Sequence, residues 1–455
     1  MTGEIVHGQV KDLLAVIEKW CHEHLPGSAV AAAEAMAEEV GRHAAAVVFE
    51  TAVGRGGHRA GYCGPRLNCA CGQTARFVGY RGRWVRSLQG EVHLERAYYH
   101  CAQCREGTAP WDLAQGLSAG SFTPRVKAKV ARLCARMVFR EAEEELRDWS
   151  GLMLAESTLE ALTLEVGTRL RAAEDARTTG WFTQGLLPPP APLAARVAGQ
   201  RAYLSVDAAK AHIDGGWHDV KVATFSRGVR GVAKEADGCL RIGSDTAQET
   251  QYLAAQETAE AFMQRTYVWA LGLGAERATE LIVLGDGAEW IWTWAGVHFS
   301  DATQILDYYH ATEHVWELSR AVFGGESAAG SAWAQACCER LEQHGPPGLL
   351  ASLQELGRVR RAGERALSSE EREAVGRELR YFRRHRKRMR YSEYRGRGLM
   401  IGSGPVEAGC KTVVGQRLKG TGMRWCNGGA DAVLAIRTAL LSQRPDQIMA
   451  SARAA

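Results

Sequence analysis

The stretch ELIVLGDG (280–287) holds four consecutive apolar residues that end at a Gly-Asp-Gly turn containing Asp286. An unbroken apolar run that stops at glycines is typical of a central strand buried on both faces. Upstream, RAYLSVDAA (201–209) is a second strand candidate, and its alternation places Asp207 on one face. WHDVKVATFS (217–226) is a third, and helical patterns lie between and after these runs. This mixture predicts an α/β domain of the catalytic type.

Asp207 and Asp286 each end a strand-like run. Aspartates at the carboxyl ends of neighbouring strands face one crevice of such a sheet. Two carboxylates repel each other, so the pair needs a cation, and hard oxygen ligands suit Mg²⁺ or Mn²⁺. The residues alone leave ordinary alternatives open, because Asp286 also suits a glycine turn and Asp207 also suits a strand edge.

A third acidic candidate is Glu407, in IGSGPVEAGCKTVVGQRLKG (401–420). Pro405 favours the first position of a helix, which places Glu407 in the first turn, with Lys411 one turn further on. A carboxylate on a helix that is otherwise basic can bind a metal ion while its neighbours hold phosphates. The ordinary alternative is a glutamate that stabilises the helix dipole or pairs with Lys411.

Four cysteines form two close pairs, Cys69 with Cys71 and Cys101 with Cys104. Between the pairs, segments 83–88 and 91–100 alternate in polarity around a turn, as the strands of a hairpin do. Two pairs at the ends of a hairpin can supply the four thiolates of a structural zinc site, which predicts a zinc ribbon. Because one residue separates the first pair, Cys63 or His100 could replace a ligand, and ordinary buried cysteines remain the alternative.

Helical patterns surround the predicted ribbon. FREAEEELRDW (139–149) and ESTLEALTLEVGTRL (156–170) form a pair with a short turn between them, which fits a DNA-binding helix-turn-helix with low specificity. Consecutive prolines in LLPPPAP (186–192) predict a domain boundary. The predicted organisation is an N-terminal helical region (1–60), a zinc ribbon (61–115), a helix-turn-helix-like DNA-binding domain (116–185), a linker (186–199), the α/β domain (200–310 and 396–455) and an all-helical segment (311–395).

The net charge of +4 is unevenly distributed. Residues 377–397 carry ten Lys or Arg and two Glu, a net charge of +8, so the rest of the chain sums to −4. Such a block favours a polyanionic partner, and beside an acidic metal site it would bind DNA phosphates. A solvated helix face is the ordinary alternative.

The composition also excludes some classes of protein. Hydrophobic residues make up 46% and charged residues 24%, which excludes wholesale disorder. No stretch approaches 18 uncharged apolar residues, and the N-terminal sequence lacks the pattern of a secretory signal. We therefore expect a cytoplasmic protein without membrane spans, in which clustered cysteines bind metal instead of forming disulfides.

Several motifs, in order along the chain, resemble DDE transposases of bacterial insertion sequences. The closest fit is the ISKra group, which is related to Mutator-like transposases, and the similarity runs from about residue 61 to 441. The motifs are GEVHLERAYYHCAQC (90–104), YLSVDAAK (203–210), GGWHDVKV (215–222), LGDGAEWIW (284–292), ILDYYHATEHVW (305–316), IGSGPVEAGCK (401–411) and RLKGTGMRW (417–425).

The resemblance implies an RNase H-like α/β catalytic domain with a large all-helical insertion (311–395), preceded by helical segments and the zinc ribbon. It implies Asp207, Asp286 and Glu407 as a catalytic triad that holds two Mg²⁺ or Mn²⁺ ions. Residues 307–310 resemble the (C/D)xxH motif of these transposases, which makes His310 a further catalytic candidate. Ala208-Ala209 stand where the family pattern leads us to expect Gly-Thr.

The implied function is binding of terminal inverted repeats, followed by DNA cleavage and strand transfer, by a homodimer or larger assembly at the nucleoid. Two alternatives stay open: a catalytically silent, transposase-derived zinc DNA-binding protein, and an RNase H-fold nuclease that cuts without joining. Asp214 and Asp219 are alternatives for the first acid. The candidate DNA-binding residues are Lys411, Arg417, Lys419, Arg383, Arg384, Arg386, Lys387 and Arg388.

Overall fold

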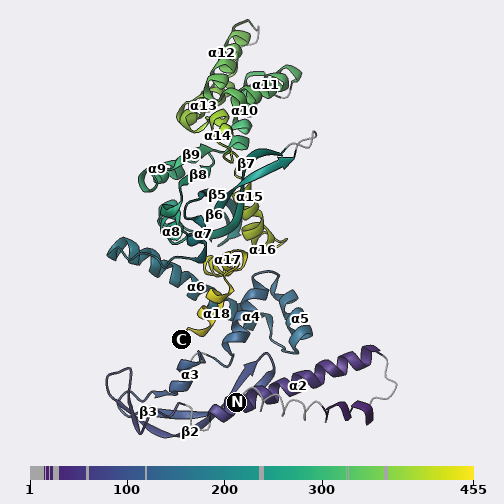
Figure 1. The fold of residues 1–455 in the computed structure, drawn as a ribbon, viewed down its shortest axis with the longest axis vertical. Coiled ribbons are helices and arrows are strands. Elements are labelled where there is room, and N and C mark those ends of the chain that lie inside the picture. The colour runs from purple at the N-terminus through teal and green to yellow at the C-terminus, as the bar shows by residue number, and fades with distance from the viewer. Residues whose placement is uncertain are drawn as a thin grey trace. The chain divides into compact units, whose positions relative to one another are not determined.

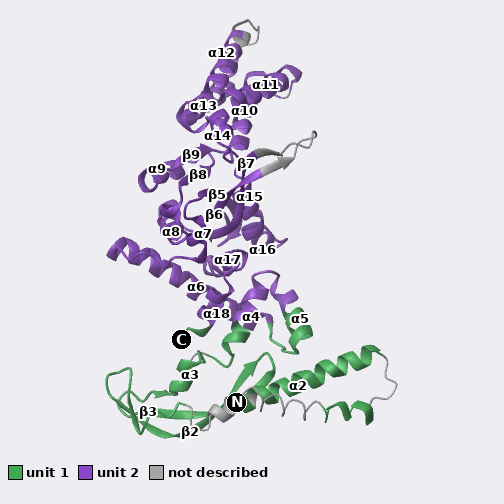
Figure 2. Cartoon of the chain, viewed as in Figure 1, with its two compact units in different colours: residues 1–127, 143–155, 453–455 green, residues 128–142, 156–452 purple. Residues whose placement is uncertain are grey.

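A computed structural model describes residues 15, 17–19, 21–23, 30–57, 61–117, 120–234, 240–323, 325, 327–362 and 367–454. The chain divides into two compact units (Figure 2). Unit 1 comprises residues 1–127, 143–155 and 453–455, and unit 2 comprises residues 128–142 and 156–452. Most of the predicted N-terminal helical region before residue 30 lies outside the described residues.

Both units mix helices and strands, which confirms the α/β class (Figure 1). Unit 1 contains α2 (Val30–Gly57), β1 (Arg66–Asn68), β2 (Thr74–Ser87), β3 (Gly90–Cys101), β4 (Gly107–Thr108) and α3 (Pro110–Ala114). Helices α4 (Pro124–Cys134) and α5 (Phe139–Ser150) each contain residues of both units.

Unit 2 begins with two helices, a five-stranded sheet and the helices between its strands. These elements are α6 (Glu156–Gln184), α7 (Pro192–Val197), β5 (Arg201–Ile213), β6 (Gly216–Lys234), β7 (Leu240–Ala255), α8 (Ala259–Gly272), η1 (Ala275–Arg277), β8 (Glu280–Gly285), α9 (Glu289–His298) and β9 (Thr303–Leu306). It continues with α10 (Tyr308–Phe323), α11 (Ala328–His344), α12 (Pro346–Ala362), α13 (Ser369–His385), η2 (Arg386–Arg388), α14 (Tyr391–Gly396), α15 (Gly404–Gly409), the π-helix η3 (Cys410–Gly415), α16 (Gln416–Leu418), α17 (Asn427–Leu441) and α18 (Pro445–Arg453).

The sheet of unit 1 is antiparallel in the order β1-β2-β3-β4. The predicted hairpin is confirmed: Ser87 pairs with Gly90 across a two-residue turn, and Gly90 has a φ of 111°. Asp112 of α3 is buried and accepts hydrogen bonds from Arg83 and Arg96, at 2.8 and 3.0 Å. This ion pair ties α3 to the hairpin, so Arg83 is not a free cation.

The sheet of unit 2 has the strand order β7-β6-β5-β8-β9. Strands β5, β6 and β7 form an antiparallel meander, whereas β8 runs parallel to β5 and β9 runs parallel to β8. The strands predicted over 201–209, 217–226 and 280–287 are confirmed. Strands β5 and β6 extend further than predicted, because they pair up to the turn at Asp214 and Gly215.

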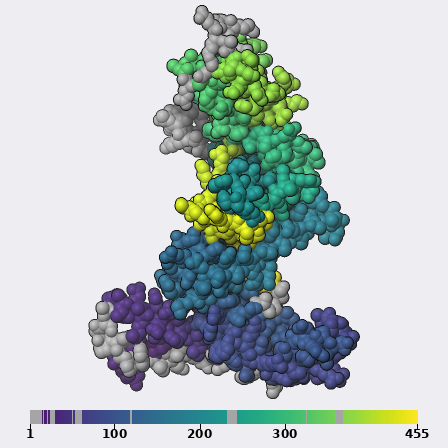
Figure 3. All heavy atoms as spheres, turned by 180° about the vertical axis from the view of Figure 1, so that it is seen from behind, coloured from purple at the N-terminus to yellow at the C-terminus, as the bar shows by residue number. Residues whose placement is uncertain are grey.

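Helices cover both faces of this sheet. Successive side chains of a strand point to opposite faces, so neighbouring residues of β6 pack against different helices. On β6, Ala223 and Phe225 belong to the core that includes Phe262 of α8 and Ile291 of α9. Their neighbour Val222 belongs to a second core, together with Val406, Val413, Val414 and Val433 from α15, η3 and α17. Figure 3 shows the C-terminal residues in yellow beside the teal residues of the sheet.

Helices α10 to α14 gather beyond strands β8 and β9 (Figure 1). The segment contains no strand among its described residues, as predicted. Trp333, Cys337 and Leu341 of α11 and Phe382 of α13 share a continuous core with the sheet. Tyr391 and Tyr394 reach the strand next to them, since their hydroxyls donate to the backbone carbonyls of Leu306 and Gln304 at 3.1 and 3.2 Å. The helical segment is therefore packed on the sheet.

Helix α6 is a long structural helix of unit 2, 29 residues in length. Leu159, Leu162, Val166 and Leu170 on one side of it are buried. Gly167 allows close approach to α17, because a Cβ at this position would lie 2.4 Å from the carbonyl oxygen of Ala432. The helix predicted over 156–170 thus continues for four more turns and uses one face for packing.

We expect Gly167→Ala to lower the free energy of unfolding by about 2 kcal/mol, since the added methyl group meets fixed backbone. Gly180→Ala on the same helix is the matched control, because its Cβ would lie 3.6 Å from a flexible Leu186 side chain. We expect the control to stabilise by up to about 1 kcal/mol, as alanine replaces glycine in a helix. Denaturant unfolding of both variants measures the difference, and equal stabilities would refute the tight α6–α17 contact.

Candidate functional site

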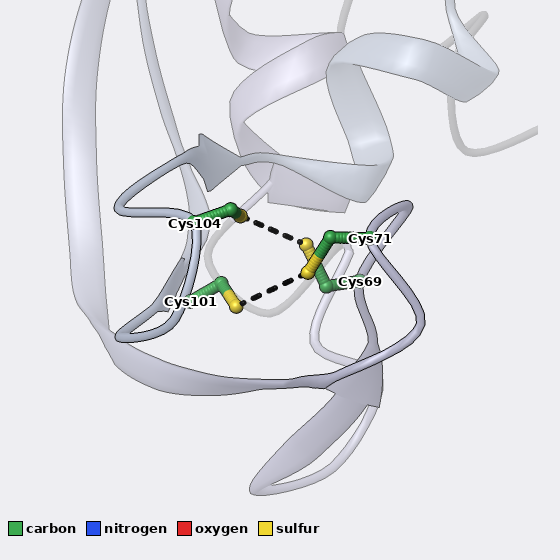
Figure 4. A group of neighbouring side chains, drawn as sticks. All are labelled: Cys69, Cys71, Cys101 and Cys104. Atoms are coloured by element: carbon green, nitrogen blue, oxygen red, sulfur yellow. Dashed lines mark hydrogen bonds between the residues drawn. The ribbon is translucent and has the colours of Figure 1, made fainter.

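The four predicted zinc ligands come together in unit 1 (Figure 4). The Sγ atoms of Cys69 and Cys104 are 3.5 Å apart, and those of Cys71 and Cys101 are 3.7 Å apart. All four sulfur atoms lie within 4.8 Å of one another. A tetrahedral zinc ion with Zn–S bonds of about 2.3 Å requires sulfur–sulfur distances of about 3.8 Å. The cluster therefore fits a metal ion such as zinc.

Two tight turns place these thiols. The Cys69 N–H donates to the Gln73 carbonyl at 2.7 Å, and Gly72 adopts a φ of 81°. In the second turn, the Cys101 N–H donates to the Glu106 carbonyl at 2.9 Å. The turn at residues 69–73 lets Cys71 point back to the cluster, which explains how one intervening residue suffices. Neither suggested replacement is part of the cluster: Cys63 is exposed and donates to Gly61, and His100 is exposed on β3.

The thiols of this cluster differ in their affinity for protons. Hydrogen bonds from the backbone of Cys104 and then Gln103 lower the pKa of Cys101 to about 7. A hydrogen bond from the backbone of Glu106 opposes the shift of Cys104, but burial and the neighbouring thiols raise its pKa to about 12. The thiolate of Cys101 thus forms readily, whereas Cys104 resists loss of its proton. A dication removes this conflict, because it stabilises all four thiolates.

A second arrangement lies at the carboxyl end of β8 in unit 2. Val206 of β5 pairs with Gly285 of the parallel strand β8, so Asp207 and Asp286 occupy the next positions on adjacent strands. Adjacent strands lie about 4.8 Å apart. The Asp207 side chain shares the sheet face of α15 and η3, since the Cys410 thiol contacts its Oδ2 atom at 3.5 Å. The structure brings the first two predicted acids together.

The pKa of Asp207 is raised, first by burial and also by the charge of Asp286. A hydrogen bond from the Ala208 N–H, 2.7 Å from Oδ1, opposes the shift, as do the Cys410 thiol and the charge of His310. The two carboxylates therefore repel across a partly buried site. Their hard oxygens and mutual repulsion suit a divalent cation, which would favour the deprotonated form of both.

Glu407 lies in the first turn of α15, as predicted, and is exposed. Its Oε1 atom accepts a hydrogen bond from the Ser403 hydroxyl at 3.0 Å. Burial and then the charge of Asp207 raise the pKa of Cys410, and the charge of Glu407 adds to this shift. However, its oxygens do not form a group with those of Asp207 and Asp286: among the described residues, only the four cysteines place three or more potential ligand atoms within 4.8 Å of one another.

Asp307 is a buried residue that organises this region, although the sequence did not identify it as a site residue. Its carboxylate accepts hydrogen bonds from the backbone N–H groups of His310, at 2.8 Å, and of Ser403. It thus connects the start of α10 to the segment that leads into α15. The only signal in the sequence is its place as the first residue of the D-x-x-H pattern.

His310 lies at the start of α10, which begins near the carboxyl end of β8, because the Asp307 N–H donates to the Gly285 carbonyl at 2.8 Å and the His310 N–H donates to Asp307 Oδ1 at 2.8 Å. Its Nδ1 atom is 3.1 Å from Glu313 Oε2, and its side chain is 38% exposed. Its ring also packs edge-on against His314, with centroids 5.2 Å apart. His310 is thus accessible at the acidic site and is not a buried packing residue.

The alternatives for the first acid lie further along the β5–β6 hairpin, past the last residue that pairs with β8. Asp214 occupies the turn, where its Oδ1 atom accepts a hydrogen bond from Asn427 N at 3.1 Å. Asp219 is exposed and forms an ion pair with Lys210 at 3.1 Å. Asp207 is thus the aspartate of β5 that lies beside Asp286.

The predicted DNA-binding residues divide into exposed and buried ones. Arg383, Arg384, Arg386 and Lys387 are exposed on α13 and η2, Lys411 is exposed on η3, and Lys419 is exposed directly after α16. Arg388 is half-buried: it stacks on Trp292 at 4.6 Å and donates to Gln304.

The prediction for Arg417 was wrong. Its side chain is 2% exposed, donates to the Cys134 carbonyl at 2.7 Å and stacks on Trp425 at 4.7 Å. Burial lowers its pKa. Arg417 is the middle residue of α16, and its side chain points into the core. It therefore cannot contact DNA phosphates.

Helix α13 lies against the loop that follows Asp286. His385 is buried, and its ring packs 6.3 Å from that of Trp292. Burial and the charges of Arg388, Arg384 and His314 lower its pKa to about 4, while a hydrogen bond with the backbone of Gly287 opposes the shift. At the exposed edge of this contact, Arg384 pairs with Glu289 at 3.1 Å. The basic block is thus anchored next to the acidic site.

We expect the depressed pKa of His385 to make stability depend on pH. The unfolded state binds the proton near pH 6.5 and the folded state near pH 4, so stability falls as the pH drops through this window. The expected loss is about 2 kcal/mol, which allows for partial solvent screening. Denaturant unfolding between pH 7 and pH 4 measures it, and His385→Gln should flatten the slope. An unchanged slope in this variant would contradict the assignment.

No protein-family model and no curated protein matches the chain. Among the described residues, no helix has the length and apolar character needed to cross a membrane.

Proposed function

We propose that the chain is a DDE-type DNA transposase that resembles the ISKra group of bacterial insertion sequences. In this proposal it binds the terminal inverted repeats of its element and catalyses metal-dependent cleavage and strand transfer. The observation that carries the proposal is the register of β5 and β8, which puts Asp207 beside Asp286 at the point where the parallel pairing of the two strands ends. Glu407 approaches the same face from α15.

The strand order supports an RNase H-like assignment for unit 2. An antiparallel meander of three strands, to which two parallel strands are added on the side of the first, is the arrangement we expect of an RNase H-like sheet. In the same proposal, helices α10 to α14 form the insertion between the second and third acids. The basic residues of α13 would then hold DNA phosphates beside the site.

Asp207, Asp286 and Glu407 would hold the two divalent ions in this proposal. Bound there, the ions supply activation of the attacking oxygen and stabilisation of the charge on the leaving oxygen. For Glu407 to take part, its side chain must leave the Ser403 hydroxyl and turn toward Asp207. This change is small, because the Glu407 side chain is exposed and bound DNA or cations would drive its rotation.

The reaction has two steps at one site. Water first attacks the phosphorus at the element end, and the bond to the 3′ oxygen breaks to leave a free 3′-hydroxyl. That hydroxyl then attacks a phosphodiester of the target, which forms a new bond and releases a target 3′ oxygen. In this proposal His310, whose side chain is 38% exposed at the start of α10, would contact the scissile phosphate. No covalent protein–DNA bond is required.

The zinc ribbon would serve as a DNA-binding module that needs its metal to fold. Among the hairpin arginines, Arg83 and Arg86 pair with Asp112 and Glu91, whereas Arg81 stacks on Tyr98. Trp84 is 61% exposed on the same hairpin. An exposed aromatic ring among arginines can contact nucleic acid by stacking and by charge. We also propose assembly as a homodimer or larger oligomer on paired DNA ends, in the bacterial cytoplasm.

The experiment that tests the proposal uses a supercoiled plasmid that carries the gene with its flanking DNA. The zinc-loaded protein with Mg²⁺ or Mn²⁺ should cut at the ends of short inverted repeats, and pre-cleaved ends should be joined to a second plasmid. Cleavage without joining would favour an RNase H-fold nuclease.

Binding without any cleavage would favour the second candidate, a catalytically silent, transposase-derived DNA-binding protein. Two observations favour that candidate: Ala208-Ala209 after the first acid, and the position of Glu407 outside the distance that one cation could bridge. Addition of EDTA to the cleavage reaction separates metal-dependent cutting from a contaminating activity that survives chelation.

A further inference from the structure

Tyr381 of α13 lies directly on the loop that follows Asp286. A Cβ added to Gly287 would lie 2.2 Å from Tyr381 Cε2 and 2.9 Å from its hydroxyl oxygen. Any side chain at position 287 would thus displace the tyrosine ring. Glycine is therefore required at position 287, because only a residue without a side chain leaves room for the Tyr381 ring of the helical segment.

The hydroxyl of Tyr381 is buried and has no hydrogen-bond partner among the described residues. Burial raises the pKa of Tyr381, and the charges of Asp286, Asp307, Glu378 and Glu313 raise it further. The phenol thus stays protonated and can act only as a donor toward anionic groups. A buried donor without an acceptor is costly, which suggests that its acceptor forms in another state of the site.

Asp286 offers such an acceptor. Its Oδ1 atom already accepts a hydrogen bond from the Ala288 N–H at 2.8 Å, while Oδ2 accepts none in the described part of the chain. A metal-bound carboxylate is usually oriented by a hydrogen bond from a neighbouring residue. Tyr381 of α13 presents a buried hydroxyl without a partner against this loop.

The Tyr381 ring is fixed by contacts with α10 and with its own helix α13. It stacks on the His314 ring, with centroids 3.6 Å apart and planes 25° apart. His314 in turn is fixed by Glu378, with 2.6 Å between Nδ1 and Oε2, and the Glu378 side chain is 2% exposed. Glu378, Tyr381 and His385 recur at helical spacing along one face of α13. This face is therefore built around the acidic site, and the exposed face carries the arginines.

We propose that the Tyr381 hydroxyl donates a hydrogen bond to the Asp286 carboxylate and orients it for a divalent cation, so that helix α13 supplies a positioning residue to the acidic site. This inference rests on the proposed function of that site. It links the two features of α13, because the helix that presents Arg383 and Arg384 to DNA also aligns the second acid. The ordinary alternative is a tyrosine that only packs against Gly287.

The test compares Tyr381→Phe with Tyr394→Phe in the zinc-loaded, full-length protein. Tyr394 is a matched control, because it is buried on the next helix and its hydroxyl donates to the Gln304 carbonyl at 3.2 Å. Binding of Mn²⁺, followed through the electron paramagnetic resonance signal of the free ion, is the readout that does not depend on activity. Thermal unfolding shows whether each variant is folded.

We expect Tyr381→Phe to weaken Mn²⁺ binding about 10-fold, as for other residues that orient a metal ligand, with an unchanged or higher melting temperature. Tyr394→Phe should keep wild-type Mn²⁺ affinity and melt at a lower temperature. The variant Asp286→Asn separates the role of Tyr381 from the existence of the acidic metal site. If Asp286→Asn weakens Mn²⁺ binding but Tyr381→Phe does not, the role of Tyr381 is overturned and the acidic site stands. If Asp286→Asn has no effect either, both the site and this inference are refuted.

Discussion

Replacing Asp286 by Asn should lower DNA cleavage at least about 1,000-fold, because several kcal/mol of transition-state stabilisation depend on a metal-bound carboxylate. The substitution keeps the shape of the side chain and the acceptor for the Ala288 N–H, 2.8 Å from Oδ1. What is lost is the negative charge beside Asp207. DNA binding should stay close to wild type, because the exposed cations of α13 are untouched.

Asp219→Asn is the matched control for this prediction. Asp219 is an exposed aspartate of the same sheet, paired with Lys210 at 3.1 Å and placed past the end of the β5–β8 pairing. We expect its cleavage rate to remain within a factor of about two, since exposed ion pairs contribute little. Equal effects of both substitutions, or normal cleavage by Asp286→Asn, would refute the catalytic role of Asp286.

Replacing Cys101 by Ser should abolish zinc binding and unfold the sheet of unit 1. The cores around Tyr99 and Val92 contain few residues, so we expect this small sheet to depend on a metal ion bound by the four cysteines. Structural zinc sites contribute about 10 kcal/mol or more of binding free energy to folding. We therefore expect the zinc content to fall from one ion per chain to none, and the amides of β2 and β3 to lose protection from hydrogen exchange.

Cys63→Ser is the control for the ribbon. Cys63 is a nearby exposed cysteine whose thiol donates to the Gly61 carbonyl at 3.4 Å and lies outside the cluster. This variant should keep one zinc ion and wild-type exchange protection. If the Cys101 variant also keeps its zinc and its protected amides, the four-thiolate centre is not what holds the sheet together.

The sequence predicted those parts of the fold in which local pattern and burial agree. The apolar run of β8 and the two cysteine pairs at the ends of a hairpin are of this kind. Strand β7 was not predicted, because its sequence LRIGSDTAQETQYLAA is mostly polar and pairs along an extended hairpin with β6. Strand β9 has four residues and little room for a pattern.

The candidate site could be predicted only in part, for the same reason. Asp207 and Asp286 are placed by strand register: the sequence indicated the end of β8 just before Asp286, whereas β5 continues past Asp207 to Ile213. Arg417 and Tyr381 depend on which side of a helix faces the core, and that is decided by contacts with distant segments such as Cys134 and Gly287. The basic sequence of α13 therefore indicates an exposed helix, although Tyr381, His385 and Glu378 of this helix point to the interior.

The proposed function depends on Asp207, Asp286 and Glu407 binding divalent cations together. Anomalous X-ray diffraction from crystals of the protein soaked in Mn²⁺ measures this directly. We predict manganese peaks between Asp207 and Asp286, with Glu407 turned away from Ser403 to complete the coordination. The absence of manganese at these aspartates in soaked crystals, with Glu407 still bound to the Ser403 hydroxyl, would contradict the proposal.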